Sequence, residues 1–276
     1  MMKVLVIGKD GQLGSELVKL IPDSIGTSRR EDSGLFLDLK NCSAIENLIM
    51  KEMPDVVINA AAQTDVDGCE RDRDYAYAIN AKAVRNIVRA CSVTGSYFIH
   101  VSTDYVFDGE KGNYNEEDVP NPINYYGISK ALGEAYALSY DDSLVIRASG
   151  VYGIKMNFPL FVVKTLRENG TVNCIDSFYS PIHATMLAGA IKEIMERRIY
   201  GVLNVSGNRM SRYDFAMKIK ETLKIETGSV KLVKEVQKLK ARRPYDSSLD
   251  NGKALRMLST KFNDMERSIR YLEKVK

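Results

Sequence analysis

The chain of 276 residues has no tryptophan, only two histidines and only four cysteines. Two histidines are too few for a histidine-rich metal site. The cysteines show neither paired nor metal-ligand spacing; they are Cys42, Cys69, Cys91 and Cys174. These patterns exclude a disulfide scaffold and a cysteine-based metal centre. We therefore expect reduced cysteines, no metal ligated by these residues and a cytoplasmic protein.

Long apolar runs and a strong net charge are missing as well. No segment approaches the length of a membrane span. The first apolar run starts directly after Lys3, and we therefore expect no signal peptide. The formal net charge is only +3, and the basic runs, such as 240–243, are short. A nucleic-acid-binding protein concentrates positive charge on one face. We therefore predict no membrane and no nucleic-acid partner.

The sequence does contain a regular alternation of short apolar runs and amphipathic segments. Apolar runs predict buried strands, and apolar residues spaced three and four apart predict helices. We expect strands over 4–7, 56–59, 97–101, 144–147 and 202–205, and helices over 14–20, 76–91, 125–140 and 185–197. Alternation of this kind builds a parallel sheet covered by helices on both faces.

The predicted fold class is therefore α/β, a Rossmann-type doubly wound parallel sheet with a small C-terminal lobe. From about Ser206 the pattern changes to helical segments joined by polar connections. We expect residues 1–153 to form the sheet domain and residues 154–276 mainly the lobe, with 181–206 returning to the sheet. Ligands of open α/β sheets bind at the carboxyl ends of the strands, so this lobe should close the site.

A glycine-rich turn follows the first strand. Gly8, Gly11 and Gly14 have the spacing G-x-x-G-x-x-G. In dinucleotide-binding turns the first glycine permits the tight turn, the second lets the backbone approach a pyrophosphate, and the third lets helix and strand pack closely. The following helix offers free N–H groups to the phosphates. A purely structural turn is the alternative, but the strand–turn–helix context favours an NAD(P)-binding domain over 1–153.

The stretch 25–30, which corresponds to the end of the second strand in dinucleotide-binding folds, predicts which cofactor binds. Many dinucleotide sites place a carboxylate there to bind the ribose 2′-hydroxyl. Here the stretch 25–30 ends in Ser28, Arg29 and Arg30, with no carboxylate before Glu31. Hydroxyl and guanidinium groups suit a 2′-phosphate. Ser28 and Arg29 are therefore predicted to favour NADPH over NADH, with charges on a surface loop as the alternative reading of the arginines.

A tyrosine and a lysine four residues apart predict the chemistry. Tyr126 and Lys130 lie on one face of the expected helix. An ammonium near a phenol lowers the pKa of the phenol from about 10, so the tyrosine can act as a general acid. The preceding strand ends in Ser102-Thr103-Asp104, at the same sheet edge as the glycine turn. Thr103 is therefore a candidate to hydrogen-bond a substrate carbonyl, with local capping as the alternative.

Taken in order over nearly the whole chain, these motifs resemble the extended short-chain dehydrogenase/reductase superfamily. Within it the sequence is similar to the dTDP-4-dehydrorhamnose reductases. The glycine turn and the Tyr–Lys pair are typical of the whole superfamily. The resemblance also includes Asn-Ala-Ala-Ala at 59–62 and Ser-Thr-Asp-Tyr-Val-Phe-Asp-Gly at 102–109. More specific to this family are the late motifs, Tyr-Asp-Phe-Ala at 213–216 and Arg-Arg-Pro with Ser247 and Leu-Asp in 242–250.

The resemblance implies an activity and a set of site residues. The expected reaction is the NAD(P)H-dependent reduction of the 4-keto group of dTDP-4-dehydro-L-rhamnose to dTDP-L-rhamnose, a precursor of surface polysaccharides and glycans. Thr103 would orient the sugar carbonyl, Tyr126 would protonate its oxygen, and Lys130 would bind the nicotinamide ribose. The expected cofactor-binding residues are Gly8, Gly11, Gln12, Leu13, Gly14, Ser28, Arg29, Asp38, Leu39, Ala60, Ala61, Ala62, Tyr126 and Lys130. The expected substrate-binding residues are Thr103, Asp104, Asn157, Phe158, Arg243 and Ser247.

The sequence departs from the family pattern in two features. The family usually has a tryptophan before its Val-Tyr-Gly run, whereas this chain has Gly150 before 151–153. We expect the glycine to remove a large aromatic wall from the substrate side. Some members also bridge a homodimer through Mg²⁺, which makes Mg²⁺ a candidate cofactor and a homodimer a candidate assembly, although the acidic ligands do not map onto this sequence.

Three alternatives stand beside this reading. A sugar-nucleotide 4,6-dehydratase or epimerase is one, but the related dehydratases have glutamate after Thr-Asp where this chain has Tyr105. A second is a reductase acting on a UDP- or GDP-linked sugar. A third is a non-catalytic subunit, because the regulatory β subunit of methionine adenosyltransferase also resembles this family.

Overall fold

The computed structural model describes residues 2–234 and 239–274. Its main feature is an 8-stranded sheet in which every pairing is parallel. Seven strands follow in the order β10-β6-β5-β4-β1-β2-β3, and β9 pairs with β6. The strands are β1 (Val4–Ile7), β2 (Ile25–Ser28), β3 (Leu35–Phe36), β4 (Val56–Asn59), β5 (Tyr97–Thr103), β6 (Ser143–Tyr152), β9 (Pro181–His183) and β10 (Gly201–Asn204).

The strands are added on both sides of β1. Strands β2 and β3 lie on one side of β1, and β4, β5, β6 and β10 lie on the other. The strand order therefore reverses between β1 and β4. In open α/β sheets, ligands bind outside the carboxyl ends of the strands at such a reversal.

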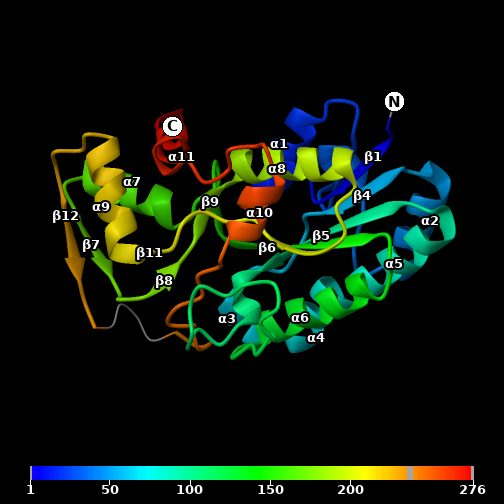
Figure 1. The fold of residues 1–276 in the computed structure, drawn as a ribbon, viewed down its shortest axis with the longest axis horizontal. Helices are drawn as coiled ribbons and strands as arrows, with labels where there is room; N and C mark the ends of the chain where they lie inside the picture. The colour runs from blue at the N-terminus through cyan, green and yellow to red at the C-terminus, as the bar shows by residue number, and fades with distance from the viewer. Residues whose placement is uncertain (1, 235–238, 275–276) are drawn as a thin grey trace.

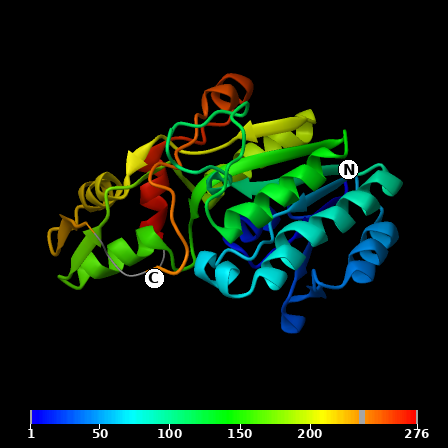
Figure 2. The ribbon, with the colours of Figure 1, turned by 90° about the horizontal axis from the view of Figure 1, so that it is seen from below.

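Helices cover both faces of the sheet (Figures 1 and 2). One face packs against α1 (Gln12–Leu20), α8 (Ala184–Arg197) and α10 (Gly252–Met257), and the other against α2 (Cys42–Glu52), α5 (Ala83–Thr94) and α6 (Tyr125–Leu138). Val4 and Val6 belong to the first core, and Leu5 and Ile7 to the second. Because successive side chains of a strand point to opposite faces, a strand buried on both faces must be apolar throughout.

Short helical segments follow the strand ends. They are the 3-10 turns η1 (Glu31–Ser33) and η3 (Asp104–Val106), the helices α3 (Val66–Arg71) and α4 (Arg73–Tyr77), and the π-helical turn η2 (Ala78–Lys82).

A smaller lobe extends beyond one end of the sheet, on the left of Figure 1. It contains α7 (Phe158–Arg167), β7 (Thr171–Cys174), β8 (Phe178–Tyr179), β11 (Met210–Ser211), α9 (Arg212–Thr222), β12 (Ser229–Leu232), α11 (Met265–Arg270) and η4 (Tyr271–Lys274). Strands β7 and β12 pair in parallel, and β8 and β11 antiparallel. The lobe has its own core, in which Leu160, Phe215 and Ile269 are buried.

The expected Rossmann-type parallel sheet is confirmed, but β3 and α2 were not expected, and other differences lie at element ends. The helix expected over 76–91 is α4, η2 and α5 in succession, reaching from Arg73 to Thr94. Within it, the buried Asn80 side chain accepts a hydrogen bond from the Gln63 N–H at 2.8 Å and donates to Ser129 Oγ at 3.0 Å. Single π turns often mark functional sites, and here the turn carries the residue that connects three segments. The division of the chain at residue 153 stays a prediction.

None of the helices in the described part of the chain combines the length and the apolar character needed to cross a membrane.

Candidate active site

A cleft of about 770 Å³ opens at the carboxyl ends of the strands. One side, here called the glycine wall, is formed by Gly8, 11–13 and 60–62. The opposite side, here called the lobe wall, is formed by Asn157, Tyr179 and Arg212. The cleft brings together fifteen of the predicted site residues: Gly8, Gly11, Gln12, Leu13, Ser28, Arg29, Leu39, Ala60, Ala61, Ala62, Thr103, Asp104, Tyr126, Lys130 and Asn157.

The glycine wall has the geometry of a phosphate-binding turn. Gly8 has a φ of +90°, and a Cβ there would lie 2.8 Å from the Cβ of Ala61. Gly14 lies beneath the turn, where a Cβ would meet the Gly8 carbonyl oxygen at 2.1 Å. Gly11 precedes α1 and offers no side chain to cap its first N–H groups. These free donors, together with the partial positive charge of the helix end, suit a pyrophosphate.

The end of β2 carries both signs of charge. Arg29 Nη1 donates to Tyr75 Oη at 2.6 Å. Asp10, from the glycine turn, accepts hydrogen bonds from the hydroxyls of Ser28 and Ser33. The Ser28 hydrogen bond is the main cause that lowers the pKa of Asp10. Sequence reasoning examined only β2 for a carboxylate, and so it missed the one that the glycine turn brings to the same place.

Tyr126 lies at the start of α6, on the floor of the cleft. Asn124 caps this helix by accepting from the Gly127 N–H at 2.9 Å, and it also donates to the Arg242 carbonyl at 3.0 Å. Tyr126 is buried, and burial raises its pKa, while a hydrogen bond to Thr103 opposes that rise. Thr103 in turn donates its hydroxyl to Asp104 at 2.9 Å. The two hydroxyls therefore form one hydrogen-bonded chain that ends on a carboxyl group.

Lys130 does not act on Tyr126 as expected. Its Nζ donates to the Val101 carbonyl at 2.7 Å and lies 3.3 Å from His100 Nε2. Burial lowers the pKa of Lys130 to about 8, partly offset by the nearby Glu134 carboxylate. The expectation that this ammonium lowers the pKa of Tyr126 is wrong for this arrangement, because the cost of burying a phenolate dominates at Tyr126. Both residues nevertheless line the same cleft.

His100 and Asn59 extend this arrangement, and sequence reasoning missed both contacts. His100 is fully buried in β5, and its Nδ1 lies 3.3 Å from Asn59 Nδ2 at the end of β4. Burial and the Lys130 charge hold the pKa of His100 well below its usual value, so the ring is neutral. The sequence did contain an indication of these contacts, because a histidine and an asparagine within apolar strands are buried polar groups that require hydrogen-bond partners.

Asp104 is buried beside the cleft and holds several segments together. Its carboxyl accepts hydrogen bonds from the hydroxyls of Ser149 at 2.7 Å and Ser247 at 2.6 Å, besides that of Thr103. Burial raises the pKa of Asp104, and these hydrogen bonds oppose that rise. Ser247 thus reaches Asp104 rather than the cleft.

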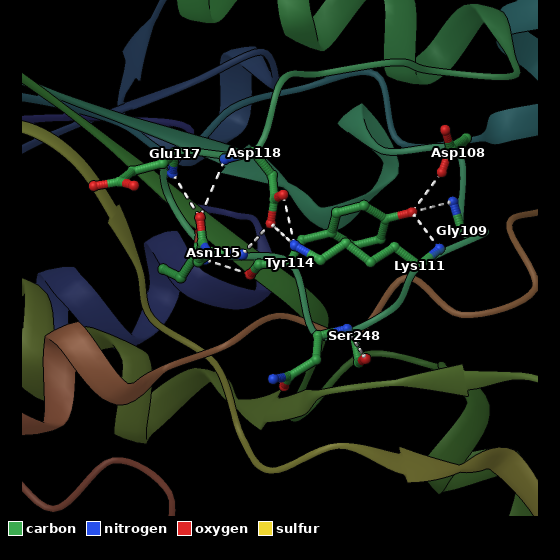
Figure 3. A network of polar contacts seen from close by, with 10 residues as sticks. Asp108, Gly109, Lys111, Tyr114, Asn115, Glu117, Asp118 and Ser248 are labelled. Atoms are coloured by element: carbon green, nitrogen blue, oxygen red, sulfur yellow. Dashed lines mark hydrogen bonds and ion pairs between the residues drawn. The ribbon is translucent and has the colours of Figure 1, made fainter.

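The loop after η3 fixes Ser247 in place. Figure 3 shows Tyr114 at the centre of this loop, donating to Asp108 while its Oη accepts from the N–H groups of Gly109 and Lys111. The Tyr114 N–H donates to the Ser248 carbonyl at 2.8 Å. Together with the bonds from the Asp246 N–H to the Gly109 carbonyl and from the Asp250 N–H to the Tyr114 carbonyl, they hold the segment 246–250 against this loop.

The lobe wall contains an aromatic ring that was not expected. Gly150 has a φ of +49°, and a Cβ there would lie 2.7 Å from two ring carbons of Tyr179. The expectation that Gly150 leaves the substrate side without an aromatic wall is therefore wrong. The Tyr179 ring packs onto the glycine and supplies that wall from β8. Arg212, whose guanidinium lies 4.5 Å from the centre of this ring, was also missed by sequence reasoning.

Five predicted residues lie outside the cleft lining: Gly14, Asp38, Phe158, Arg243 and Ser247. Asp38 accepts from the Lys40 N–H at 2.9 Å in the loop before α2. Arg243 pairs with Asp67 at 3.2 Å and lines a separate cavity of about 520 Å³. Phe158 packs against the lobe core. The structure therefore does not bring these side chains to the cleft.

No group of three or more His, Cys, Asp or Glu side chains that could hold a metal ion occurs within residues 2–234 and 239–274.

Comparison with known proteins gives a family match over residues 2–275, described as the RmlD substrate binding domain. A dTDP-4-dehydrorhamnose reductase of Aggregatibacter actinomycetemcomitans is 32% identical, over 98% of this chain and 98% of the relative. A methionine adenosyltransferase 2 subunit beta of Rattus norvegicus is 28% identical, over 91% of this chain and 81% of the relative.

Two solved structures are similar along almost their whole length. A hypothetical dTDP-4-dehydrorhamnose reductase from Sulfolobus tokodaii is 52% identical with a TM-score of 0.90, covering 96% of this chain and 98% of that one. A dTDP-4-dehydrorhamnose reductase from Bacillus anthracis str. Ames, in complex with NADP, is 28% identical with a TM-score of 0.90, covering 99% of each chain.

Proposed function

The chain belongs to the RmlD family of dTDP-4-dehydrorhamnose reductases, and from this premise we propose that it reduces the 4-keto group of dTDP-4-dehydro-L-rhamnose with NADPH or NADH. The product is dTDP-L-rhamnose. The observation that carries the proposal is the position of Tyr126. Its phenol lies in the cleft that also contains the glycine turn, so a proton donor and a dinucleotide site share one space.

The glycine wall fits the cofactor. Its free N–H groups and the absence of a Cβ at Gly8 and Gly11 suit the pyrophosphate. When bound, the reduced nicotinamide supplies the hydride that adds to C4 of the sugar. The preference between NADPH and NADH remains a proposal in favour of NADPH, supported by Arg29 and Arg30 at the cleft and opposed by Asp10. Mg²⁺ is not part of the proposal.

Tyr126 supplies the proton. Its raised pKa keeps the phenol protonated at neutral pH, which is the state that a general acid needs at the start of a reduction. Thr103 donates its own hydroxyl hydrogen to Asp104, so its oxygen acts as the acceptor toward Tyr126, as it also does toward the Tyr105 N–H at 3.3 Å. Thr103 thereby orients the phenol.

Lys130 has a different role from Tyr126. With a pKa of about 8 it is mainly an ammonium at neutral pH, and one of its hydrogens is bound to the Val101 carbonyl. An ammonium has three donors. We propose that a remaining donor binds the nicotinamide ribose, as the family resemblance implies.

The experiment that tests the proposal is a substrate panel. Oxidation of NADPH and of NADH is followed with dTDP-, UDP- and GDP-linked 4-keto-6-deoxysugars, and the sugar product is identified. Fast oxidation with the dTDP-linked sugar and formation of dTDP-L-rhamnose is the expected result. A dehydrated or epimerised product without net oxidation of the cofactor would assign the chain to another reaction of the superfamily.

A non-catalytic role is the second candidate, because the methionine adenosyltransferase 2 subunit beta covers 91% of this chain at 28% identity. Binding of NADPH without turnover of any keto-sugar in the panel, together with co-purification of a synthetase, would favour it. A homodimer is likewise a proposal, which the mass in solution by light scattering tests.

A further inference from the structure

The first residue of α9, Arg212, is positioned by aromatic rings from two other elements of the lobe. Its guanidinium carbon lies 4.5 Å from the centre of the Tyr179 ring and 5.4 Å from that of Phe158. Its backbone N–H donates to the Ser177 carbonyl at 3.0 Å. Guanidinium groups stack favourably on aromatic faces, and such stacking fixes their orientation while leaving their N–H edge free. Arg212 is therefore a preorganised cation at the lobe wall.

The charge of Arg212 is not neutralised by an ion pair with any residue in the described part of the chain. Asp104 is the carboxyl group that interacts electrostatically with Arg212, but its oxygens already accept hydrogen bonds from Thr103, Ser149 and Ser247. The phenol of Tyr105 hydrogen-bonds to the Arg212 side chain, but burial keeps this phenol neutral, so it does not act as a counter-ion. A half-buried cation without a counter-ion costs desolvation energy that a bound anion would offset.

Arg209 offers the contrast. It lies three residues earlier and also stacks on a ring, 4.0 Å from the centre of Phe178. Arg209, however, pairs with Asp246 at 2.7 Å and is not part of the cleft lining. Arg209 and Arg212 thus both stack on aromatic rings, but of these two only Arg212 lines the cleft and lacks an ion pair.

The Tyr179 hydroxyl is an unsatisfied hydrogen-bonding group at this wall. Tyr179 is 5% exposed, and its Oη has no hydrogen-bond partner among the described residues. Gly150 is required for this arrangement, because a Cβ at position 150 would lie 2.7 Å from the ring. The glycine that departs from the family pattern is therefore the residue that admits the Tyr179–Arg212 stack.

From these contacts we propose that Arg212 binds the diphosphate of the nucleotide-linked sugar, so that the substrate must carry a phosphate on its anomeric carbon. The proposal rests on the proposed reductase function and names the group by which the substrate is recognised. A planar guanidinium donates paired hydrogen bonds to phosphate oxygens. Arg212 lies near Asp104 and Tyr105, the two residues that follow Thr103 in the chain, and so on the substrate side of the cleft rather than at the glycine turn.

Two anions then bind in one cleft by different means. Backbone N–H groups of the glycine wall take the pyrophosphate of the dinucleotide. A stacked side chain on the lobe wall takes the diphosphate of the sugar nucleotide. Replacement of Arg212 should weaken only the second.

The test measures calorimetric binding of dTDP, UDP and GDP, and of the parent nucleosides, to protein saturated with NADPH. Arg212→Gln is expected to weaken the preferred nucleoside diphosphate by about 10- to 100-fold, the loss of a charged hydrogen-bonding group. Its nucleoside should bind as to the wild type. Arg212→Lys should fall between the two, and Arg209→Gln should match the wild type. NADPH affinity and thermal unfolding of each variant show that the fold is retained.

Two results would overturn the proposal. One is an Arg212→Gln variant that binds the diphosphate as tightly as the wild type, or loses affinity for the nucleoside to the same degree. The other is a wild-type protein that binds no nucleoside diphosphate more tightly than its nucleoside. Failure of the reductase function is a separate outcome, seen as the absence of NADPH oxidation by a wild type whose diphosphate binding still depends on Arg212.

Discussion

The two sides of the cleft are built by opposite means. The glycine wall comes mainly from a short contiguous turn, and it presents backbone N–H groups that the absence of side chains exposes. The lobe wall comes from three segments, at Asn157, Tyr179 and Arg212, and it presents side chains fixed by packing across the lobe. A backbone wall can be recognised from the spacing of its glycines, whereas a side-chain wall exists only once distant segments have come together.

The largest expected effect lies where the two walls meet, at Tyr126. Tyr126→Phe should lower kcat by about 10²- to 10⁴-fold, because the proton donor is lost. NADPH should bind normally, since the glycine wall is unchanged. Steady-state kinetics and fluorescence titration measure the two effects. Tyr125→Phe is the matched control, because the Tyr125 ring faces Arg73 outside the cleft; wild-type turnover by Tyr126→Phe would remove that residue as the acid.

The second largest effect is expected from a methyl group added beneath the glycine wall, which should lower the stability of the protein. In Gly14→Ala the new Cβ would lie 2.1 Å from the Gly8 carbonyl oxygen, where only backbone could yield. We expect the free energy of unfolding to fall by about 3 kcal/mol, the upper range for overpacking. Gly189→Ala in α8 is the control, since its Cβ would meet only Thr260 Cγ2 at 3.4 Å. Equal denaturation midpoints for the two variants would contradict the close-packing role.

The joint between sheet and lobe should show a dependence on acid. His183 stacks on Tyr271 with ring centres 4.8 Å apart and accepts from the Thr185 N–H at 3.2 Å. Burial lowers its pKa from 6.5 to about 4, partly offset by the Glu16 charge. Between these two values the unfolded chain binds more protons, so stability should fall as the pH falls, by up to about 3 kcal/mol.

Denaturant unfolding at pH 7 and at pH 4.5 measures this term. His183→Asn keeps an acceptor for the helix cap but has no proton to take up, so its stability should fall less than that of the wild type. The same loss of stability in both proteins would assign the acid sensitivity to other groups.

The smallest expected effect concerns cofactor choice at the edge of the glycine wall. Arg29→Ala should raise the Kd of NADPH about 10-fold, the value of one charged hydrogen bond, and leave that of NADH unchanged. Arg89→Ala, an exposed arginine on α5, is the control. Titration of both cofactors decides the matter, and equal weakening of the two would refute a 2′-phosphate contact at Arg29.

The sequence predicted what depends on local spacing. The order of strands and helices, the glycine turn and the shared face of Tyr126 and Lys130 follow from residues close together in the chain. It could not predict that Arg243 pairs with Asp67, or that Lys130 faces His100, because these contacts depend on how distant segments pack. The pKa of Tyr126 was misjudged for a related reason, since the degree of burial cannot be derived from the spacing of a tyrosine and a lysine.

The path of the chain has a consequence for engineering. After leaving the sheet at β6, the chain contributes α7–β8, β11–β12 and α11–η4 to the lobe, and it returns to the sheet between these pieces. A fragment ending at residue 153 would lack β10 and α8, and so it would leave one side of β6 unpaired and one face uncovered. Exchange of the lobe between relatives would therefore require three separate grafts, and substrate range should be easier to alter by single substitutions than by module shuffling.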